Sequence, residues 1–362
     1  MYDAIVIGAR CAGATTAMLL ARKGLDVLLV DRAQFPSDIP HGHFIHRHGP
    51  RRLAEWGLLD RVLASGCPRV TQFTSDFGDF ELTGRDLEVD GIPMGLGPRR
   101  TALDAILVEA AVEAGAEFRE GTPVRELTFD GDRVTGIAGE RARIVIGADG
   151  RNSGVAKHVG APFTHARPPL TVWYFSYWSG IPDPGLSVHV RDRTAIFAFP
   201  TNDDRFGLFV AWPLSELTRV KADIEAAMLG VVDGVPGLGE RVRAGRREER
   251  LAGATQLPNF VRKPHGPGWA LVGDAGCHKD PFMALGVCDA FRDAELLADA
   301  VASEAPLEEY ERRRDEATLP DFERNFGAAH LVAPPELLAQ RQTLRGDQEA
   351  TNRFFLAFEG MI

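Results

Sequence analysis

The chain opens with two apolar runs joined by a segment of helical composition. Residues 2–7 and 25–31 are mostly apolar, as is typical of parallel strands that are buried on both faces. Residues 12–24 combine alanine, leucine and methionine, and they close with Gly24, which suits the position after a helix end. The pattern therefore predicts a strand–helix–strand unit.

Two later apolar runs each end in a turn of glycine and aspartate. Residues 141–147 lead into Asp149, and residues 270–272 lead into Asp274. A long helix is predicted after the second turn, over residues 288–304. An acid–glycine turn is a common way to end a strand, so neither turn by itself predicts a function.

A different pattern fills the middle of the chain. Residues 171–182 and 195–213 have the composition of strands separated by turn residues, which predicts a mixed or antiparallel sheet. Alternation along the first of these strands places three aromatic side chains on one face: Trp173, Phe175 and Tyr177. Such a stripe is usually core, and the alternative is the wall of an apolar substrate pocket.

The last part of the chain, residues 301–362, predicts a helical segment. We expect its charged face to be solvated, and we expect three phenylalanines, Phe354, Phe355 and Phe358, to cap the pocket.

Composition and charge narrow the class of protein. The formal net charge of -10 disfavours a nucleic-acid partner, because phosphate binding needs a basic surface. The four cysteines form no C-x-x-C pair, which disfavours a zinc site and favours reduced thiols in a cytoplasm. No apolar run resembles a signal peptide or a membrane span. We therefore expect a cytoplasmic protein without a nucleic-acid partner.

The stretch GARCAG, residues 8–13, follows the first predicted strand. Gly8 and Gly13 occupy the first and last glycine positions of a dinucleotide fingerprint, but Arg10 replaces the middle glycine. Arg10 is compatible with a nucleotide if its side chain points away from the phosphates or contacts them. Asp31 ends the second strand, where a carboxylate can bind ribose hydroxyls. Arg32 after it favours FAD without excluding NAD.

Together, the GARCAG turn, the central GADG (147–150) and the late GD (273–274) before a helix resemble a known superfamily. It contains the FAD-dependent monooxygenases of the para-hydroxybenzoate hydroxylase type and also geranylgeranyl-reductase-like and halogenase-like flavoproteins. The resemblance extends from Tyr2 to about Ala300. It implies an α/β protein: a Rossmann-like FAD-binding domain, an inserted sheet-rich substrate domain and a C-terminal helical tail. The corresponding ranges are 1–70, 95–160 and 255–300 for the FAD-binding domain, 71–94 and 161–254 for the substrate domain, and 301–362 for the tail.

The resemblance also implies roles for particular residues. Asp274 would bind the ribityl chain, Asp149 would lie near the pyrophosphate, and Arg100, in an R-x-x-L segment, would contact the cofactor. The backbone of Val124 would hold the adenine. The full set of predicted cofactor residues is Gly8, Arg10, Cys11, Ala12, Gly13, Asp31, Arg32, His43, Arg100, Val124, Asp149, Gly273, Asp274, Pro281, Gly286 and Val287.

Residues 41–48 hold four histidines, but their spacing fits no zinc pattern and no acid or cysteine accompanies them. We therefore predict no metal. By family position this loop runs over the flavin, so His43 and His46 are candidates for cofactor or substrate contact. We expect His41 and His48 to be solvated. Non-covalent FAD is favoured over a histidyl–flavin bond. The predicted substrate-pocket residues are Trp173, Phe175, Tyr177 and His46.

The chemistry expected of this superfamily is monooxygenation. A second dinucleotide fingerprint is missing from the sequence, so NAD(P)H would visit transiently or a separate flavin reductase would supply electrons. Molecular oxygen would then form a flavin C4a-hydroperoxide that hydroxylates an aromatic or polyketide-like substrate. His278 is a candidate for the acid or base, and the alternative is that it shapes its loop.

Other functions stay open. One is a flavin-dependent reductase or desaturase of an isoprenoid or biosynthetic intermediate, another is a non-catalytic flavin-binding protein, and a third is a simple NAD-dependent dehydrogenase. Halogenation is not favoured, because WSGIP (178–182) lacks the second tryptophan of the halogenase element W-x-W-x-I-P.

Overall fold

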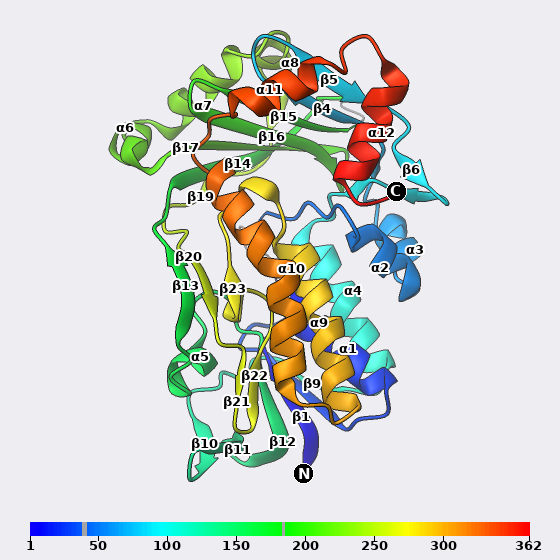
Figure 1. Cartoon of the computed structure of the whole chain (residues 1–362), viewed down its shortest axis with the longest axis vertical. Helices are drawn as coiled ribbons and strands as arrows, with labels where there is room; N and C mark the ends of the chain where they lie inside the picture. Colours follow the sequence, from blue (N-terminus) through cyan, green and yellow to red (C-terminus); the bar gives the residue numbers. More distant parts are fainter. Residues whose placement is uncertain (38–41, 183–184) are drawn as a thin grey trace.

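The predicted strand–helix–strand unit forms the centre of the lower half of the molecule (Figure 1). The computed structural model describes residues 1–37, 42–182 and 185–362. Strand β1 (Tyr2–Ile7) leads through the glycine turn into helix α1 (Cys11–Arg22), and β2 (Val27–Val30) follows. Gly24 has a φ of 85° and donates its N–H to the carbonyl of Ala21 at 2.9 Å, so it ends the helix as predicted.

Within the described residues, the sheet around this unit has eight strands. Its parallel part runs in the order β22, β12, β1, β2 and β9. Because β2 follows β1 on one side and β12 returns on the other, the order reverses at β1, where α/β proteins bind ligands. The further strands are β9 (Glu117–Arg119), β10 (Leu127–Asp130), β11 (Arg133–Ile137), β12 (Glu140–Gly147), β21 (His265–Gly266) and β22 (Trp269–Leu271).

The register of this sheet brings four strand ends to one edge. Ile7 lies opposite Val30 and Gly147, and Gly147 lies opposite Leu271. The loops that leave these strands therefore start side by side, although they are far apart in the sequence. Both predicted glycine–aspartate turns are among them.

Helices cover one face of this sheet, where α1 packs against α4 (Arg100–Glu113) and α9 (Gly286–Ala302), and α10 (Leu307–Ala328) packs on α9 (Figure 1). Buried alanines such as Ala14, Ala17 and Ala298 allow these helices to approach closely. On the other face, the central strands share an apolar cluster with the edge strands β10 and β11 and with α5 (Gly154–His158). Because both faces are covered, the strands are apolar throughout.

A second sheet forms the upper part of the molecule, with the strand order β18, β14, β17, β16, β15, β4 and β5, and β19 beside β14 (Figure 1). The described pairs are antiparallel except β15 with β4, so of the two predicted arrangements, mixed or antiparallel, the sheet is the mixed one. The strands are β4 (Phe73–Asp76), β5 (Glu81–Gly84), β14 (Thr171–Ser179), β15 (Leu186–Arg191), β16 (Thr194–Thr201), β17 (Arg205–Pro213), β18 (Arg246–Arg247) and β19 (Ala252–Ala254).

The two faces of this sheet pack on different elements. Trp173, Phe175 and Tyr177 join one apolar cluster, as their alternation predicts. Tyr174 and Trp178 join another cluster on the opposite face, under the helices α6 (Leu217–Ala222), α7 (Ile224–Asp233) and α8 (Leu238–Ala244).

Smaller elements join the two halves. A three-stranded sheet contains β13 (Phe163–Arg167), β20 (Asn259–Arg262) and β23 (Cys277–His278), so β13 pairs with a strand from the other predicted domain. The predicted domain boundaries stay predictions. The remaining elements are α2 (Gly49–Glu55), α3 (Leu59–Ala64), β3 (Arg69–Val70), β6 (Glu88–Val89), β7 (Ile92–Pro93), β8 (Gly95–Leu96), and the 3-10 turns Leu214–Glu216, Gly273–Ala275 and Pro281–Met283.

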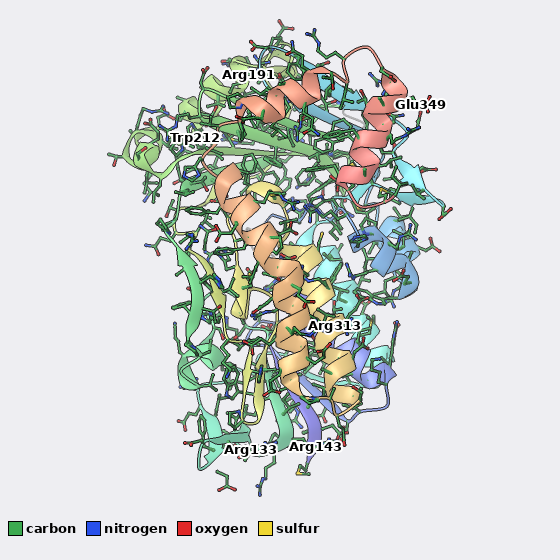
Figure 2. All side chains as sticks on the ribbon, in the orientation of Figure 1. Arg133, Arg143, Arg191, Trp212, Arg313 and Glu349 are labelled. Carbon is green, nitrogen blue, oxygen red and sulfur yellow. The ribbon has the colours of Figure 1, made fainter. Side chains whose placement is uncertain are left out.

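The C-terminal region is helical, as predicted: α10 is followed by α11 (Pro335–Gln342) and α12 (Gln348–Phe358). The expectation that the charged face is merely solvated is wrong for α10. Arg313 is exposed (Figure 2), but Arg314 beside it is buried and donates to the carbonyl of Arg262 at 3.0 Å. One face of α10 is therefore a buried polar surface that binds backbone groups.

The glycine turn generates a stability prediction. A Cβ at Gly13 would lie 1.7 Å from the carbonyl oxygen of Gly8, so Gly13→Ala should force α1 away from β1. We expect a loss of about 2–3 kcal/mol of unfolding free energy, measured by chemical denaturation. Gly230→Ala, in the exposed part of α7, is the matched control and should raise stability by about 0.5–1 kcal/mol. Equal stability of the two variants would contradict this packing.

Candidate functional site

Four loops meet where the parallel strands end. A Cβ at Gly8, which has a φ of 102°, would lie 2.5 Å from the carbonyl oxygen of Ala148, and a Cβ at Gly273 would lie 2.7 Å from the Cβ of Ala12. The glycine turn, the GADG turn and the GD turn are thus packed against one another. Glycine is required at Gly8 because the backbone of Ala148 lies so close, and at Gly273 because of its φ of 60° and the nearby methyl group of Ala12.

The Asp31 carboxylate secures the glycine turn. It accepts hydrogen bonds from the N–H of Ala9 at 2.7 Å and of Ala33 at 2.8 Å, and the residue is 9% exposed. Arg32 beside it is exposed. Asp31 therefore stabilises the glycine turn. Its contact with ribose stays a prediction.

Arg10 points toward helix α4. Its guanidinium pairs with Asp104 at 2.9 Å and donates to the Ser37 hydroxyl at 3.0 Å. The missing middle glycine is therefore replaced by a side chain that an acid and a hydroxyl hold in place.

Asp104 was not predicted from the sequence. It is fully buried, and it also pairs with Arg100 at 2.9 Å and accepts from the thiol of Cys11 at 3.4 Å. Its spacing of four residues from Arg100 was the available signal, because residues four apart lie on the same face of a helix.

Arg100 connects this acid to the GD turn. Burial disfavours its charge, but Cys11, Asp104 and Asp274 together raise the pKa of the guanidinium above its usual value. Arg100 and Asp274, predicted from separate motifs, are therefore close enough to interact. Arg100 is 8% exposed, so its charge is buried with that of Asp104.

Two long helices, α1 and α9, start at this edge, and their N-termini are suited to bind a diphosphate. Neither α1 nor α9 has a side-chain cap among the described residues, so N–H groups of their first turns stay available. A Cβ at Gly286 would meet no described atom within 4 Å, which leaves open space at the start of α9. Cys11, Ala12 and Val287 lie in these first turns.

Asp149 and Val124 lie at the same sheet. One oxygen of the Asp149 carboxylate accepts from the N–H groups of Gly154 at 2.7 Å and Val155 at 3.1 Å, while the other is buried without a partner among the described residues. Val124 packs on the cluster that covers this face. The free N–H groups at the starts of α1 and α9, the buried oxygen of Asp149 and the open space at Gly286 fit FAD. The contacts of FAD with individual residues stay predictions.

The predicted residues His43 and Tyr177 are brought together. His43 is 1% exposed, and its Nε2 lies 2.8 Å from the Tyr177 hydroxyl. Phe199 and Phe209 pack around the imidazole, with ring centres at 5.1 and 6.0 Å. The guanidinium of Arg99 lies 3.9 Å from the ring centre of Tyr177. Arg99 was not predicted, although it adjoins Arg100.

Burial lowers the pKa of His43 to about 3, with smaller contributions from the charges of Arg99 and Arg100. The imidazole is therefore neutral under ordinary conditions. It lies between Arg100, which interacts with Asp274, and the aromatic face of the upper sheet.

The other predicted pocket residues form the wall around this pair. Phe175 stacks on Phe209 at 4.6 Å, and the Trp173 indole donates to the Thr171 hydroxyl at 2.8 Å. Phe354, Phe355 and Phe358 of α12 pack on the same cluster. The aromatic stripe is therefore core at its outer end and borders the histidine loop at its inner end.

His46 lies apart from His43. Its ring contacts Glu359 and the carbonyl of Met283, and the residue is 6% exposed. His48 is exposed, as predicted, and His41 lies outside the described residues.

His278 is 5% exposed, and its Nδ1 lies 2.5 Å from the carbonyl oxygen of Pro258. Its ring stacks on Phe260 with centres 5.8 Å apart. These contacts support the alternative in which His278 shapes its loop. Pro281 begins the 3-10 turn that leads from this loop to α9.

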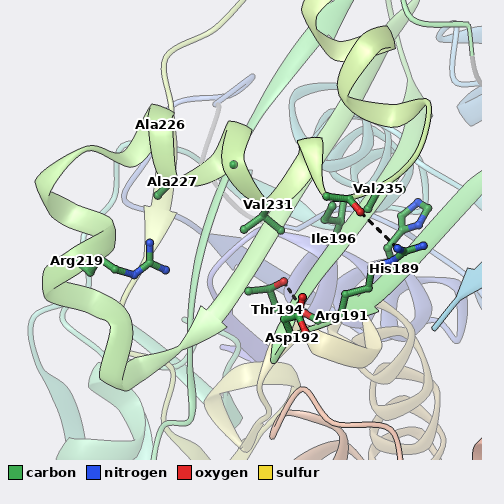
Figure 3. Close-up of a pocket in the computed structure, with 12 residues that line it drawn as sticks. His189, Arg191, Asp192, Thr194, Ile196, Arg219, Ala226, Ala227, Val231 and Val235 are labelled. Atoms are coloured by element: carbon green, nitrogen blue, oxygen red, sulfur yellow. Dashed lines mark hydrogen bonds between the residues drawn. The ribbon is translucent and has the colours of Figure 1, made fainter. Parts of the chain in front are cut away.

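A cavity of about 280 Å³ lies on the opposite face of the upper sheet, between β15–β16 and α6–α7 (Figure 3). His189, Arg191 and Arg219 line it. His189 and Arg191 contact the Asp76 carboxylate, and Arg219 pairs with Glu216. None of the predicted site residues is among the described residues that line this cavity.

Two searches of the described residues bear on metal and membrane binding. In the ranges 1–37, 42–182 and 185–362, no group of three or more His, Cys, Asp or Glu side chains could hold a metal ion. Among the helices of the described residues, none is long and apolar enough to cross a membrane.

The fold and these turns define a class, the FAD-dependent oxidoreductases. Residues 1–223 match the family described as FAD binding domain, and the chain belongs to that family. A digeranylgeranylglycerophospholipid reductase from Methanocella arvoryzae is 25% identical over 358 residues, covering 91% of this chain and 87% of the relative. Rifampicin monooxygenase from Rhodococcus hoagii is 26% identical over 356 residues, covering 92% of this chain and 72% of the relative.

The flavin-dependent brominase Bmp2 has the same fold. Its solved structure has a TM-score of 0.82 and 20% identity, covering 99% of this chain and 93% of that chain. The comparison supports the α/β architecture with its C-terminal helices.

The buried His43 generates a pH prediction. Folded His43 is neutral down to pH about 3, whereas the unfolded chain binds a proton below pH 6.5. Its contribution to stability is therefore complete above pH 6.5 and decreases as the pH falls toward 3, by up to about 1.4 kcal/mol per pH unit. His43→Gln should flatten this slope in denaturation series. His158→Gln, at an exposed residue, should keep it. An unchanged slope in His43→Gln would contradict a buried neutral imidazole.

Proposed function

We propose that this FAD-dependent oxidoreductase is a reductase that saturates a carbon–carbon double bond of an apolar, isoprenoid-like small molecule. The observation that carries the proposal is the buried His43–Tyr177 hydrogen bond at an aromatic wall. It supplies a proton donor in a site from which apolar side chains exclude water. The match to a digeranylgeranylglycerophospholipid reductase over 91% of the chain supports the same reaction class.

The cofactor would be held by the turns at Gly8, Asp31, Asp149 and Asp274 and by the starts of α1 and α9. Bound FAD, once reduced, supplies a hydride. NAD(P)H as a transient visitor, or a separate flavin reductase, would supply the electrons. The remaining task of the protein is to bind the apolar substrate and to deliver one proton.

Tyr177 is the residue placed to deliver that proton. In the tautomer that carries hydrogen on Nε2, His43 donates to the phenol oxygen, and the phenol proton can pass to a substrate carbon. The Arg99 guanidinium over the ring stabilises the phenolate that results. The low pKa of His43 keeps the imidazole neutral, so it orients the phenol without adding a second charge.

A monooxygenase is the second candidate. Rifampicin monooxygenase aligns with 92% of this chain. The same aromatic wall would suit an aromatic or polyketide-like substrate, and a dry site is equally necessary when molecular oxygen is the co-substrate.

Turnover without oxygen separates the two candidates. The holoprotein is reduced under argon and mixed with an isoprenoid that contains double bonds. A reductase recovers its oxidised-flavin absorbance with formation of saturated product in argon. A monooxygenase stays reduced until oxygen is admitted and then gives a product with one added oxygen atom. Product only after admission of oxygen would contradict the proposed function.

Tyr177→Phe tests the proton donor. The variant should bind FAD normally and lose about 100-fold or more in kcat, because the acid in the transition state is missing. Tyr174→Phe on the same strand removes a hydroxyl from the opposite face and should keep wild-type kcat. Full activity of Tyr177→Phe would remove Tyr177 from the mechanism.

A further inference from the structure

The turn after α12 contacts the loop that starts α9, and His46 is the link. The Nδ1 of His46 lies 2.7 Å from Oε2 of Glu359, and its Nε2 lies 3.0 Å from the carbonyl oxygen of Met283. His46 is 6% exposed and Glu359 is 1% exposed. The contact therefore joins a histidine predicted as a cofactor or substrate residue to an acid more than three hundred positions away.

Both ring nitrogens face acceptors. A carbonyl oxygen can only accept, so Nε2 must carry a hydrogen. The Glu359 oxygen that faces Nδ1 also accepts from the backbone N–H of Arg47 at 3.1 Å, which favours an ionised carboxylate. An imidazole that donates from both nitrogens is an imidazolium. The Arg47 side chain is itself paired with Asp321 at 2.8 Å, so Glu359 balances the charge of His46.

The backbone around His46 is held as firmly as its ring. Its carbonyl accepts from the Cys288 thiol at 3.1 Å, which ties it to the first turn of α9. Next to Glu359 in the chain, a Cβ at Gly360 would lie 3.1 Å from Nε2 of His48. The histidine loop, the start of α9 and the turn after α12 therefore form one packed unit.

Met283 belongs to the segment that enters α9. Its N–H donates to the Asn325 side chain at 3.0 Å, and Asn325 in turn donates to the carbonyl of Asp280 at 2.9 Å. Ala284, the next residue, has a φ of 49°, a conformation that neighbours must hold. His46 is the contact that holds the Met283 carbonyl, one residue before this strained position.

We propose that Glu359 is a positioning residue of the cofactor site. It keeps His46 as a cation against the Met283 carbonyl, and through this contact it sets the path of the segment into the uncapped start of α9.

Glu359→Gln is the test, and Glu349→Gln is the matched control. Glu349 lies on α12 with its side chain 84% exposed, in an ion pair with Arg353 at 3.0 Å (Figure 2). We expect Glu359→Gln to stay folded, to raise the FAD dissociation constant about 10-fold, and to lose the second ring proton of His46, as observed by NMR with isotope-labelled histidine. Glu349→Gln should match the wild type in both measurements. A wild-type FAD affinity in Glu359→Gln would overturn the proposal.

A second variant covers the case in which Glu359→Gln does not fold. His46→Gln keeps a donor for the Met283 carbonyl but leaves the Glu359 carboxylate without its counter-charge. It should therefore shift the flavin midpoint potential to more negative values. A wild-type potential in His46→Gln would overturn the proposal. NMR of the holoprotein with isotope-labelled histidine should show His46 protonated on both nitrogens, and a neutral His46 would contradict the assignment. These measurements need no substrate, so their outcome is independent of the proposed reductase activity.

Discussion

A single buried carboxylate organises the charges at the cofactor edge. Asp104 lies on α4 without solvent exposure, and it pairs with Arg10 from the glycine turn and Arg100 from its own helix. Removing one partner of a buried ion pair is far more damaging than removing both, because the remaining charge stays in an apolar environment. Asp104 is therefore what allows an arginine to stand where other dinucleotide turns have glycine. It also fixes Arg100 between Asp274 and His43.

Much of the fold could be predicted from local patterns. Apolar runs that end in glycine predicted β1 and β12, and strand alternation predicted the shared face of Trp173, Phe175 and Tyr177. These predictions succeed because periodicity and turn chemistry act over a few residues. The convergence of the three turns could be predicted as well, since parallel strands expose their carboxyl ends at one edge.

The contacts between distant segments could not be predicted. In the sequence, nothing distinguishes Asp104 from other acidic residues on helices. It becomes the partner of Arg10 only because the glycine turn passes next to α4. The His43–Tyr177 pair depends on how the histidine loop crosses the upper sheet. The charged face of α10 is predicted to be solvated, because charged side chains are usually exposed and the sequence does not show which backbone groups they will meet. The contact of Glu359 with His46 has no local signal either.

The strand order has a consequence for how the chain reaches its native state. Strand β1 pairs with β12, so Tyr2 meets Ala142, and β22 joins only after the whole upper sheet has been synthesised. Contacts between such distant segments carry a high cost in loop-closure entropy, and proteins rich in them fold slowly. The nucleotide edge is therefore among the last features to be completed. A ligand that binds only this completed edge draws the folding equilibrium toward the native state by mass action.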